Sequence, residues 1–250
     1  MSVDYALARG IATITLNSPE NRNALSSSLV AELTGHLETA AADPAVRAIL
    51  LTHTGSTFCA GADLAESAAE GGPAKGTQRM VELLRRILEA PKPVIAVIDG
   101  NVRAGGLGLV GACDLAVAGF GSSFAFTEAR IGVAAAIISL TTRPVMQPRA
   151  AARYLLTGEK FGAPVAAEIG LITLAAQNLA TEVDELTTAL RLASPQGLAE
   201  TKRLLNKELL ARFDQDAQEL AALSARLFDS DDAREGIMAF LQKRSPSWVL

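Results

Sequence analysis

Two glycine-containing turns and one acidic segment carry the residues whose types and spacing suggest chemistry. The turns are Ala60-Gly61-Ala62-Asp63 and Ala104-Gly105-Gly106, and each precedes a predicted helix. Backbone amides at the start of a helix have no intrahelical acceptor, so they attract negative charge, either on a bound phosphate or on an oxygen during a reaction. The acidic segment is Thr127-Glu128-Ala129-Arg130, whose carboxylate could move a proton.

Phosphate binding has one pattern in its favour. Residues 106–111 read GLGLVG and match the G-x-G-x-x-G fingerprint, and Glu128 lies near the distance at which an acid would bind a ribose. However, the first glycine of that fingerprint belongs in the turn directly after the strand. Here Gly106 comes eight positions after Ile98, the last residue of the predicted strand. We therefore favour a site that stabilises an oxyanion.

Composition argues against several other classes of protein. The chain has 250 residues, a formal net charge of −4 and 4% aromatic residues, which does not suit a nucleic-acid interface. No apolar run approaches a membrane span and the N-terminus lacks a secretory pattern, so we expect a cytoplasmic protein without a membrane partner. The two cysteines and two histidines match no metal-ligand or catalytic-triad spacing, so we expect no metal site, and we expect Cys59 and Cys113 to be small buried residues.

The elements that would position the candidate residues include several short strands. Apolar or alternating runs predict strands over residues 12–16, 46–51, 93–98, 114–118 and 123–126, of which 46–51 would be covered on both faces. Apolar residues at helical spacing predict helices over residues 25–42, 80–88, 107–112 and 148–156. Residues 65–76 have little periodicity and are expected to form a mobile loop.

The second half of the chain is predicted to be helical. One helix would end at Gly170, and others would cover residues 181–192, 214–227 and 230–243. A further helix would begin at Ser194-Pro195 and bury a stripe of Leu198, Leu204, Leu205 and Leu209. Strands in the first half and helices in the second predict an α/β core with a helical tail.

Several short motifs, spread over nearly the whole chain, together resemble one family. They are Ser18-Pro19 through Asn23-Ala24-Leu25, FCAGADL at 58–64, CDLAVAG at 113–119, RYLLTGEKF at 153–161, Ala166-x-x-x-Gly-Leu, and AFLQKRSP at 239–246. In this combination the chain resembles the crotonase (enoyl-CoA hydratase/isomerase) superfamily, and the bacterial enoyl-CoA hydratases in particular.

The resemblance implies a fold, a substrate class and a set of site residues. The fold would be α/β, with a crotonase-like ββα spiral core over residues 1–190 and a C-terminal helical trimerisation region over 191–250. The substrate would be an acyl-CoA thioester, with no separate cofactor, and the assembly a homotrimer or a dimer of trimers. The backbone N–H groups of Ala62 and Gly105 would hold the thioester oxygen. Coenzyme A would bind around Arg22, Ala24, Ala60, Asp63 and Leu64, with Phe240 and Lys243 at its nucleotide end in the same or a neighbouring subunit.

The sequence departs from the family pattern at two places. The first of the two glutamates that hydratases of this family commonly use would fall at Gly108, whereas the second falls at Glu128. The family's Pro-Gly-x-Gly-Gly turn is replaced by residues 134–137, which read AAAI. With one carboxylate, we expect a hydratase/isomerase-type enzyme in which Glu128 is the acid–base residue. The alternatives are an enoyl-CoA isomerase and an acyl-CoA-binding protein without catalysis. Glu128 could also be a surface residue or pair with Arg130, and Arg130 could instead pair with a substrate carboxylate.

Overall fold

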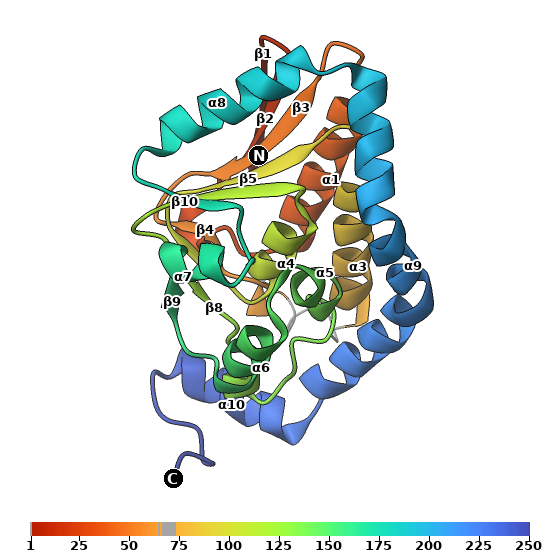
Figure 1. The fold of residues 1–250 in the computed structure, drawn as a ribbon. Helices are drawn as coiled ribbons and strands as arrows, with labels where there is room; N and C mark the ends of the chain where they lie inside the picture. Colours follow the sequence, from red (N-terminus) through yellow and green to blue (C-terminus); the bar gives the residue numbers. More distant parts are fainter. Residues whose placement is uncertain (1, 65, 67–73) are drawn as a thin grey trace.

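The computed structural model describes residues 2–64, 66 and 74–250 (Figure 1). Within them, one sheet has six strands in the order β1 (Val3–Ala8), β2 (Ile11–Leu16), β3 (Ala48–His53), β5 (Val94–Ile98), β7 (Leu115–Gly119) and β10 (Leu174–Ala176). A smaller sheet has four strands in the order β4 (Thr57–Cys59), β6 (Asn101–Arg103), β8 (Ser123–Ala125) and β9 (Phe161–Gly162). The predicted strands are all present.

Both faces of the larger sheet are covered, which explains why its central strands are almost wholly apolar. Successive side chains of a strand point to opposite faces. Val94 and Ala96 of β5 lie in the main core with helices α1 (Ser27–Ala42) and α3 (Ala74–Glu89), whereas Ile95 packs in a second cluster with α8 (Leu179–Leu192). Figure 1 shows α8 lying across the sheet, apart from α1 and α3.

A strand–strand–helix unit recurs in the first half of the chain. β3 leads to β4 and then α3, β5 leads to β6 and then α4 (Gly105–Ala112), and β7 leads to β8 and then α5 (Ser139–Val145). In each unit the first strand joins the larger sheet and the second joins the smaller one. This repeated ββα arrangement confirms the predicted α/β spiral core.

Helices dominate the rest of the chain, as predicted. They are α6 (Pro148–Thr157), α7 (Ala163–Glu168), α8, α9 (Pro195–Phe228) and α10 (Asp231–Leu241). No helix of the described ranges is both long and apolar enough to cross a bilayer. The predicted division at residue 190 falls within the last turn of α8, and it stays a prediction.

Helix α9 corrects two predictions. It runs unbroken over 34 residues, so the two helices predicted on either side of residue 214 are one. Leu204 and Leu205, predicted to be buried, are 67% and 73% exposed. The face that is buried instead carries Lys202, Phe213, Ala217 and Ala221. That face is hard to recognise because Lys202 lies on it, with its Nζ bonded to the carbonyl oxygen of Ile87 at 2.8 Å.

Two further expectations need correction. Strands β9 and β10 lie beyond residue 160, so the strands are not confined to the first half of the chain. Residues 74–76, predicted as loop, begin α3. Residue 66, also predicted as loop, is helical, and the other residues of the predicted loop, 65 and 67–73, lie outside the described residues.

Candidate active site

Three parallel strands of the smaller sheet bring the candidate residues to one edge. β4 pairs in parallel with β6, and β6 pairs in parallel with β8. The carboxyl ends of parallel strands meet at the same edge of a sheet, which is where ligands bind in many α/β folds. Ala62 follows β4, Gly105 follows β6, and Glu128 lies three residues beyond β8. The segment that bears Gly105 is therefore central, between those that bear Ala62 and Glu128.

The turns that follow β4 and β6 touch each other. A Cβ added to Gly61 would lie 3.1 Å from the nitrogen of Gly105, and one added to Gly105 would lie 3.7 Å from the nitrogen of Ala62. Gly61 also has a φ of +93°, a conformation that side chains disfavour. Glycine at position 61 therefore lets the two amides approach each other, and a side chain at position 105 would meet the Cδ1 of Leu25 at 3.1 Å.

The N–H of Ala62 belongs to the same peptide unit as the carbonyl of Gly61, and a hydrogen bond to that carbonyl orients it. The Gly61 carbonyl accepts from the N–H of Leu25 at 2.8 Å. Because a trans peptide directs C=O and N–H in opposite directions, the N–H of Ala62 points away from Leu25. Among the described residues, neither this N–H nor that of Gly105, the first residue of α4, donates to a protein acceptor. Both are free to bind an oxygen from outside the chain.

Asn23 holds this arrangement in place, a role that the sequence did not reveal. Asn23 and the preceding Arg22 have φ values of 51° and 52°, a region in which asparagine is enriched. The buried amide of Asn23 bonds to the carbonyl oxygens of Thr57 (2.7 Å) and Thr54 (3.1 Å) and to the N–H of Ser18 (2.7 Å). These bonds tie the segment before α1 to the start of β4, which sets Leu25 against Gly61. The polar character of residues 20–23 was the one feature of the sequence that could have indicated this role of Asn23.

Glu128 is a buried carboxylate. The residue is 8% exposed, and its Oε2 has no hydrogen-bond partner in the part of the chain that the structure describes. Burial raises the pKa of Glu128 to about 7, although the backbone N–H groups of Glu128 and Thr127 act in the opposite sense. A carboxyl with a pKa near neutrality can accept a proton and return it at physiological pH. The alternative that Glu128 is a surface residue is therefore wrong.

Arg130 does not pair with Glu128. Its exposed side chain donates from Nε to the carbonyl oxygen of Thr157 at 2.8 Å. This bond ties the short 3-10 helix η2 (Glu128–Ile131) to the end of α6. The alternative of an ion pair between the two residues is therefore wrong, whereas contact with a substrate carboxylate stays a prediction.

Position 108 has no room for a second carboxylate. A Cβ added to Gly108 would lie 2.7 Å from the Cγ2 of Ile138 and 3.0 Å from the Cε of Met80. Ile138 directly precedes α5, and Met80 belongs to α3. Apolar side chains therefore fill the space into which a residue at this position would project.

Most of the residues expected to bind coenzyme A lie together. The carbonyl oxygen of Arg22 accepts from the N–H of Ala60 at 3.1 Å, and Ala24 is buried in the same segment. A carboxylate oxygen of Asp63 accepts from the Nδ2 of Asn21 at 2.8 Å. The segment around Arg22 and the turn after β4 thus form one cluster.

The three other expected coenzyme A residues differ in their placement. Leu64 follows Asp63 and is half-buried beside this cluster. Phe240, on α10, is 53% exposed, and Lys243 is exposed just beyond that helix. Within the described ranges, no hydrogen bond or ion pair joins Phe240 or Lys243 to the cluster around Arg22.

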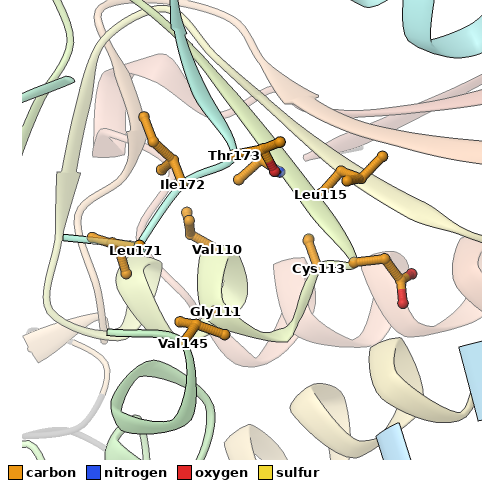
Figure 2. A pocket seen from close by; sticks show the side chains of 11 residues that line it. Val110, Gly111, Cys113, Leu115, Val145, Leu171, Ile172 and Thr173 are labelled. Atoms are coloured by element: carbon orange, nitrogen blue, oxygen red, sulfur yellow. The ribbon is translucent and has the colours of Figure 1, made fainter. Parts of the chain in front are cut away.

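Two cavities lie away from the strand edge. The smaller, of about 100 Å³, is at the C-terminal end of α4 and is lined by residues that include Val110, Gly111, Cys113 and Ile172 (Figure 2). The larger, of about 660 Å³, lies between α8 and the larger sheet, next to Leu50, Val97 and Val183. Neither is lined by Ala62, Gly105 or Glu128. Among the described residues, no group of histidine, cysteine, aspartate and glutamate side chains is placed to hold a metal ion.

Comparison with known proteins relates the chain to one family. The family model for enoyl-CoA hydratase/isomerase matches residues 7–249. A crystal structure of an enoyl-CoA hydratase from Mycobacterium avium is 58% identical, covers 99% of both chains and superposes with a TM-score of 0.94. A Thermus thermophilus protein with a provisional enoyl-CoA hydratase name is 37% identical over 94% of this chain and 96% of its own length. A 1,2-epoxyphenylacetyl-CoA isomerase from Escherichia coli is 32% identical over 96% of this chain and 95% of its own length.

Proposed function

The chain belongs to the enoyl-CoA hydratase/isomerase family, and we propose that it acts on an unsaturated acyl-CoA thioester through an enolate. The proposal rests mainly on Glu128. Its carboxyl is buried, and among the described residues its Oε2 has no hydrogen-bond partner. Glu128 follows β8, which pairs in parallel with β6, the strand that leads to the amide of Gly105. On its other side β6 pairs in parallel with β4, the strand that leads to the amide of Ala62. Together they offer one group that can move a proton and two that can bind an oxyanion.

The amides of Ala62 and Gly105 would bind the thioester oxygen. Removing a proton from C2, or adding a nucleophile to C3 of a 2-enoyl thioester, moves negative charge onto that oxygen. Each preorganised donor can lower the barrier by about 3 kcal/mol. Gly105 lies at the N-terminus of α4, where the helix dipole also favours negative charge.

Glu128 would act first as a base and then as an acid. In hydration, its carboxylate takes a proton from water as the oxygen attacks C3, and the resulting carboxylic acid returns that proton to C2 of the enolate. The two transfers need opposite protonation states of one group. A pKa of about 7 makes both states accessible near neutral pH.

An enoyl-CoA isomerase is the second candidate, and the filled space beside Gly108 favours it. Ile138 and Met80 occupy the volume that a second carboxylate would need. Moving a proton between C2 and C4 requires one base that takes the proton from one carbon and returns it to the other. Glu128 alone is enough for that transfer.

The remaining parts of the proposal concern substrate binding and assembly. Coenzyme A would bind mainly to backbone groups of the cluster that includes Arg22, Ala24, Ala60, Asp63 and Leu64. Its nucleotide end would reach Phe240 and Lys243 of the same or a neighbouring subunit in a homotrimer or a dimer of trimers. No cofactor is needed beyond the coenzyme A of the substrate.

An assay with two substrates tests the proposal. Purified protein is given a trans-2-enoyl-CoA and, separately, a 3-enoyl-CoA; a 3-hydroxyacyl product identifies a hydratase, and a shifted double bond identifies an isomerase. Glu128→Gln should lower kcat about 10²- to 10⁴-fold for the active substrate. Glu159→Gln, which changes a surface carboxylate bonded to Arg153, should leave kcat unchanged. Tight binding of both thioesters without turnover would contradict catalysis and leave an acyl-CoA-binding protein.

A further inference from the structure

Helix α10 lies directly on the turn that carries Glu128, and two glycines form the contact. A Cβ added to Gly132 would lie 2.5 Å from the carbonyl carbon of Asp232, in the first turn of α10. A Cβ added to Gly236, about one turn further along α10, would lie 2.5 Å from the carbonyl carbon of Ile131. Because the atoms that block both positions belong to the main chain, no rotamer change can make room for a side chain. Figure 1 shows α10 next to α6 at the end of the molecule opposite α8.

The turn beneath α10 is closed around the main chain of Glu128. Gly132, which has a φ of +78°, and Val133 both donate their N–H groups to the carbonyl oxygen of Glu128, Val133 at 3.1 Å. Arg130 ties the same turn to the end of α6. The Glu128 turn is thus held from α6 by a hydrogen bond and from α10 by backbone packing.

We propose that Gly132 and Gly236 are positioning residues for the reaction: by letting α10 rest on η2, they hold the Glu128 carboxyl at the strand edge and out of water. This inference rests on the proposed function of Glu128. Glycine in a helix interior is disfavoured relative to alanine. The close approach of the Ile131 main chain explains why a glycine lies at position 236 within α10.

Charged groups near the turn do not compete for Glu128. On α10, Arg234 pairs with Asp231, and Asp232 is exposed. On α6, Arg153 pairs with Glu159, and Arg149 is exposed. Contact with α10 therefore acts on Glu128 through burial and position, and not through a neighbouring charge.

The decisive variant is Gly236→Ala, with Gly35→Ala as the matched control. Gly35 lies inside α1, and a Cβ added there meets no atom within 4 Å. We expect Gly236→Ala to displace α10 and lower kcat about 10- to 100-fold, with KM changed less than about twofold, because small misplacements of a catalytic group are costly. The Glu128 carboxyl, followed by carbon-detected NMR independently of turnover, should titrate below its wild-type pKa as water reaches it. Gly35→Ala should change neither kcat nor this titration.

A milder variant keeps the test valid if Gly236→Ala does not fold. Ser230 caps α10, with its Oγ accepting from the N–H of Ala233 at 3.2 Å. Ser230→Ala loosens the first turn of α10, including Asp232, while both glycines remain. It should lower kcat about two- to fivefold, because the lost cap loosens the end of α10 that rests on η2, and shift the Glu128 titration in the same direction.

The outcomes separate this inference from the proposed function. The positioning role would be overturned if the folded Gly236→Ala variant kept both its kcat and its Glu128 titration unchanged. If Gly236→Ala does not fold, the same result in Ser230→Ala would overturn it. A rise in KM alone would overturn it too. Failure of the proposed function would appear with both glycines unchanged, as full activity of Glu128→Gln or as titration of the wild-type Glu128 in the ordinary range of a glutamate.

Discussion

Helix α4 lies between two carboxylates that are largely removed from water, the buried Glu128 and the mostly buried Asp114, and whose surroundings differ. Asp114 follows the C-terminal end of α4, and its Oδ2 lies 2.7 Å from the Nζ of Lys202 and accepts from the N–H of Val94 at 2.7 Å. Glu128 follows β8, whose last residue, Ala125, accepts from the N–H of Ala104 at the N-terminal end of α4 at 3.3 Å. The Oε2 of Glu128 has no partner within the described ranges. Burial raises the pKa of both carboxyls, but at Asp114 the Lys202 ammonium opposes that rise.

Asp114 and Glu128 therefore differ in whether a neighbouring positive charge compensates the burial of the carboxyl. The Lys202–Asp114 pair joins α9 to the start of β7 and compensates each charge with the other. A buried carboxyl without such compensation costs stability, and perturbed groups of this kind are concentrated at functional sites. A carboxyl beside α4 is therefore paired within the fold at Asp114, whereas at Glu128 it is available for the reaction that we propose.

Removing the partner of Asp114 should have the largest effect on stability. Lys202→Met leaves a buried carboxylate without its counter-charge, and we expect a loss of about 3–5 kcal/mol in the free energy of unfolding, measured by urea denaturation. The double variant with Asp114→Asn should recover most of that loss, and kcat per folded molecule should stay unchanged. A loss below about 1 kcal/mol would show that the pair has little structural role.

Neutralising Glu128 should instead stabilise the protein, in a pH-dependent manner. The folded-state pKa of about 7 exceeds the ordinary value of 4.5, so between these pH values the folded state binds more protons than the unfolded state. Wild-type stability should therefore fall as pH rises from about 4.5 to about 7, by roughly 3 kcal/mol in total, and stay low above that. Glu128→Gln lacks this loss, so thermal unfolding should show it to be the more stable protein above pH 7. Equal pH profiles of the two proteins would argue against an uncompensated carboxyl.

The packing of Ile138 and Met80 against Gly108 can be tested by adding one methyl group at position 108. Gly108→Ala would place its Cβ 2.7 Å from the Cγ2 of Ile138, so we expect a loss of about 1–3 kcal/mol from overpacking. Combining it with Ile138→Ala removes the clash, so the second substitution should cost less in the Gly108→Ala background than in the wild type. A single variant as stable as the wild type would mean that the space at position 108 can open, and that a second acid could be accommodated there.

Arg130 should show the smallest effect. Arg130→Met removes the bond to the Thr157 carbonyl, and we expect a loss of about 1 kcal/mol in stability. KM should change equally for acyl-CoA substrates with and without a terminal carboxylate. A selective rise in KM for the carboxylate-bearing substrate would assign Arg130 to substrate recognition.

The sequence predicted those elements whose patterns are local. Residues 93–112 show an apolar run, a glycine-containing bend and a second apolar run. The two apolar runs are β5 and α4, whereas the bend between them also contains the unpredicted strand β6. The strands of the smaller sheet have two or three residues each. β8 was predicted from its apolar run at residues 123–126, whereas β4, β6 and β9 are too short to show a periodic pattern. On α9, Lys202 lies on the buried face because its Nζ finds acceptors there, an arrangement that depends on residues more than 80 positions away.

The candidate site was predictable in part. Residue types alone indicated two amide-bearing turns and one acidic segment, and the family resemblance was needed to select Ala62, Gly105 and Glu128 among them. The role of Asn23 depends on carbonyl groups at Thr54 and Thr57, and spacing does not reveal it. Contacts between segments that are far apart in the sequence, such as the one between η2 and α10, become visible only in the folded chain.

Exchange of the C2 proton of the substrate shows whether Glu128 moves that proton. The wild type and Glu128→Gln are incubated in deuterated water with whichever enoyl-CoA the wild type turns over, and deuterium at C2 is followed by NMR. The account predicts that the wild type incorporates deuterium at a rate that rises with pH through about 7, and that Glu128→Gln incorporates it at least about 10²-fold more slowly. Equal incorporation by the two proteins would contradict the account, because another group would then be moving the proton.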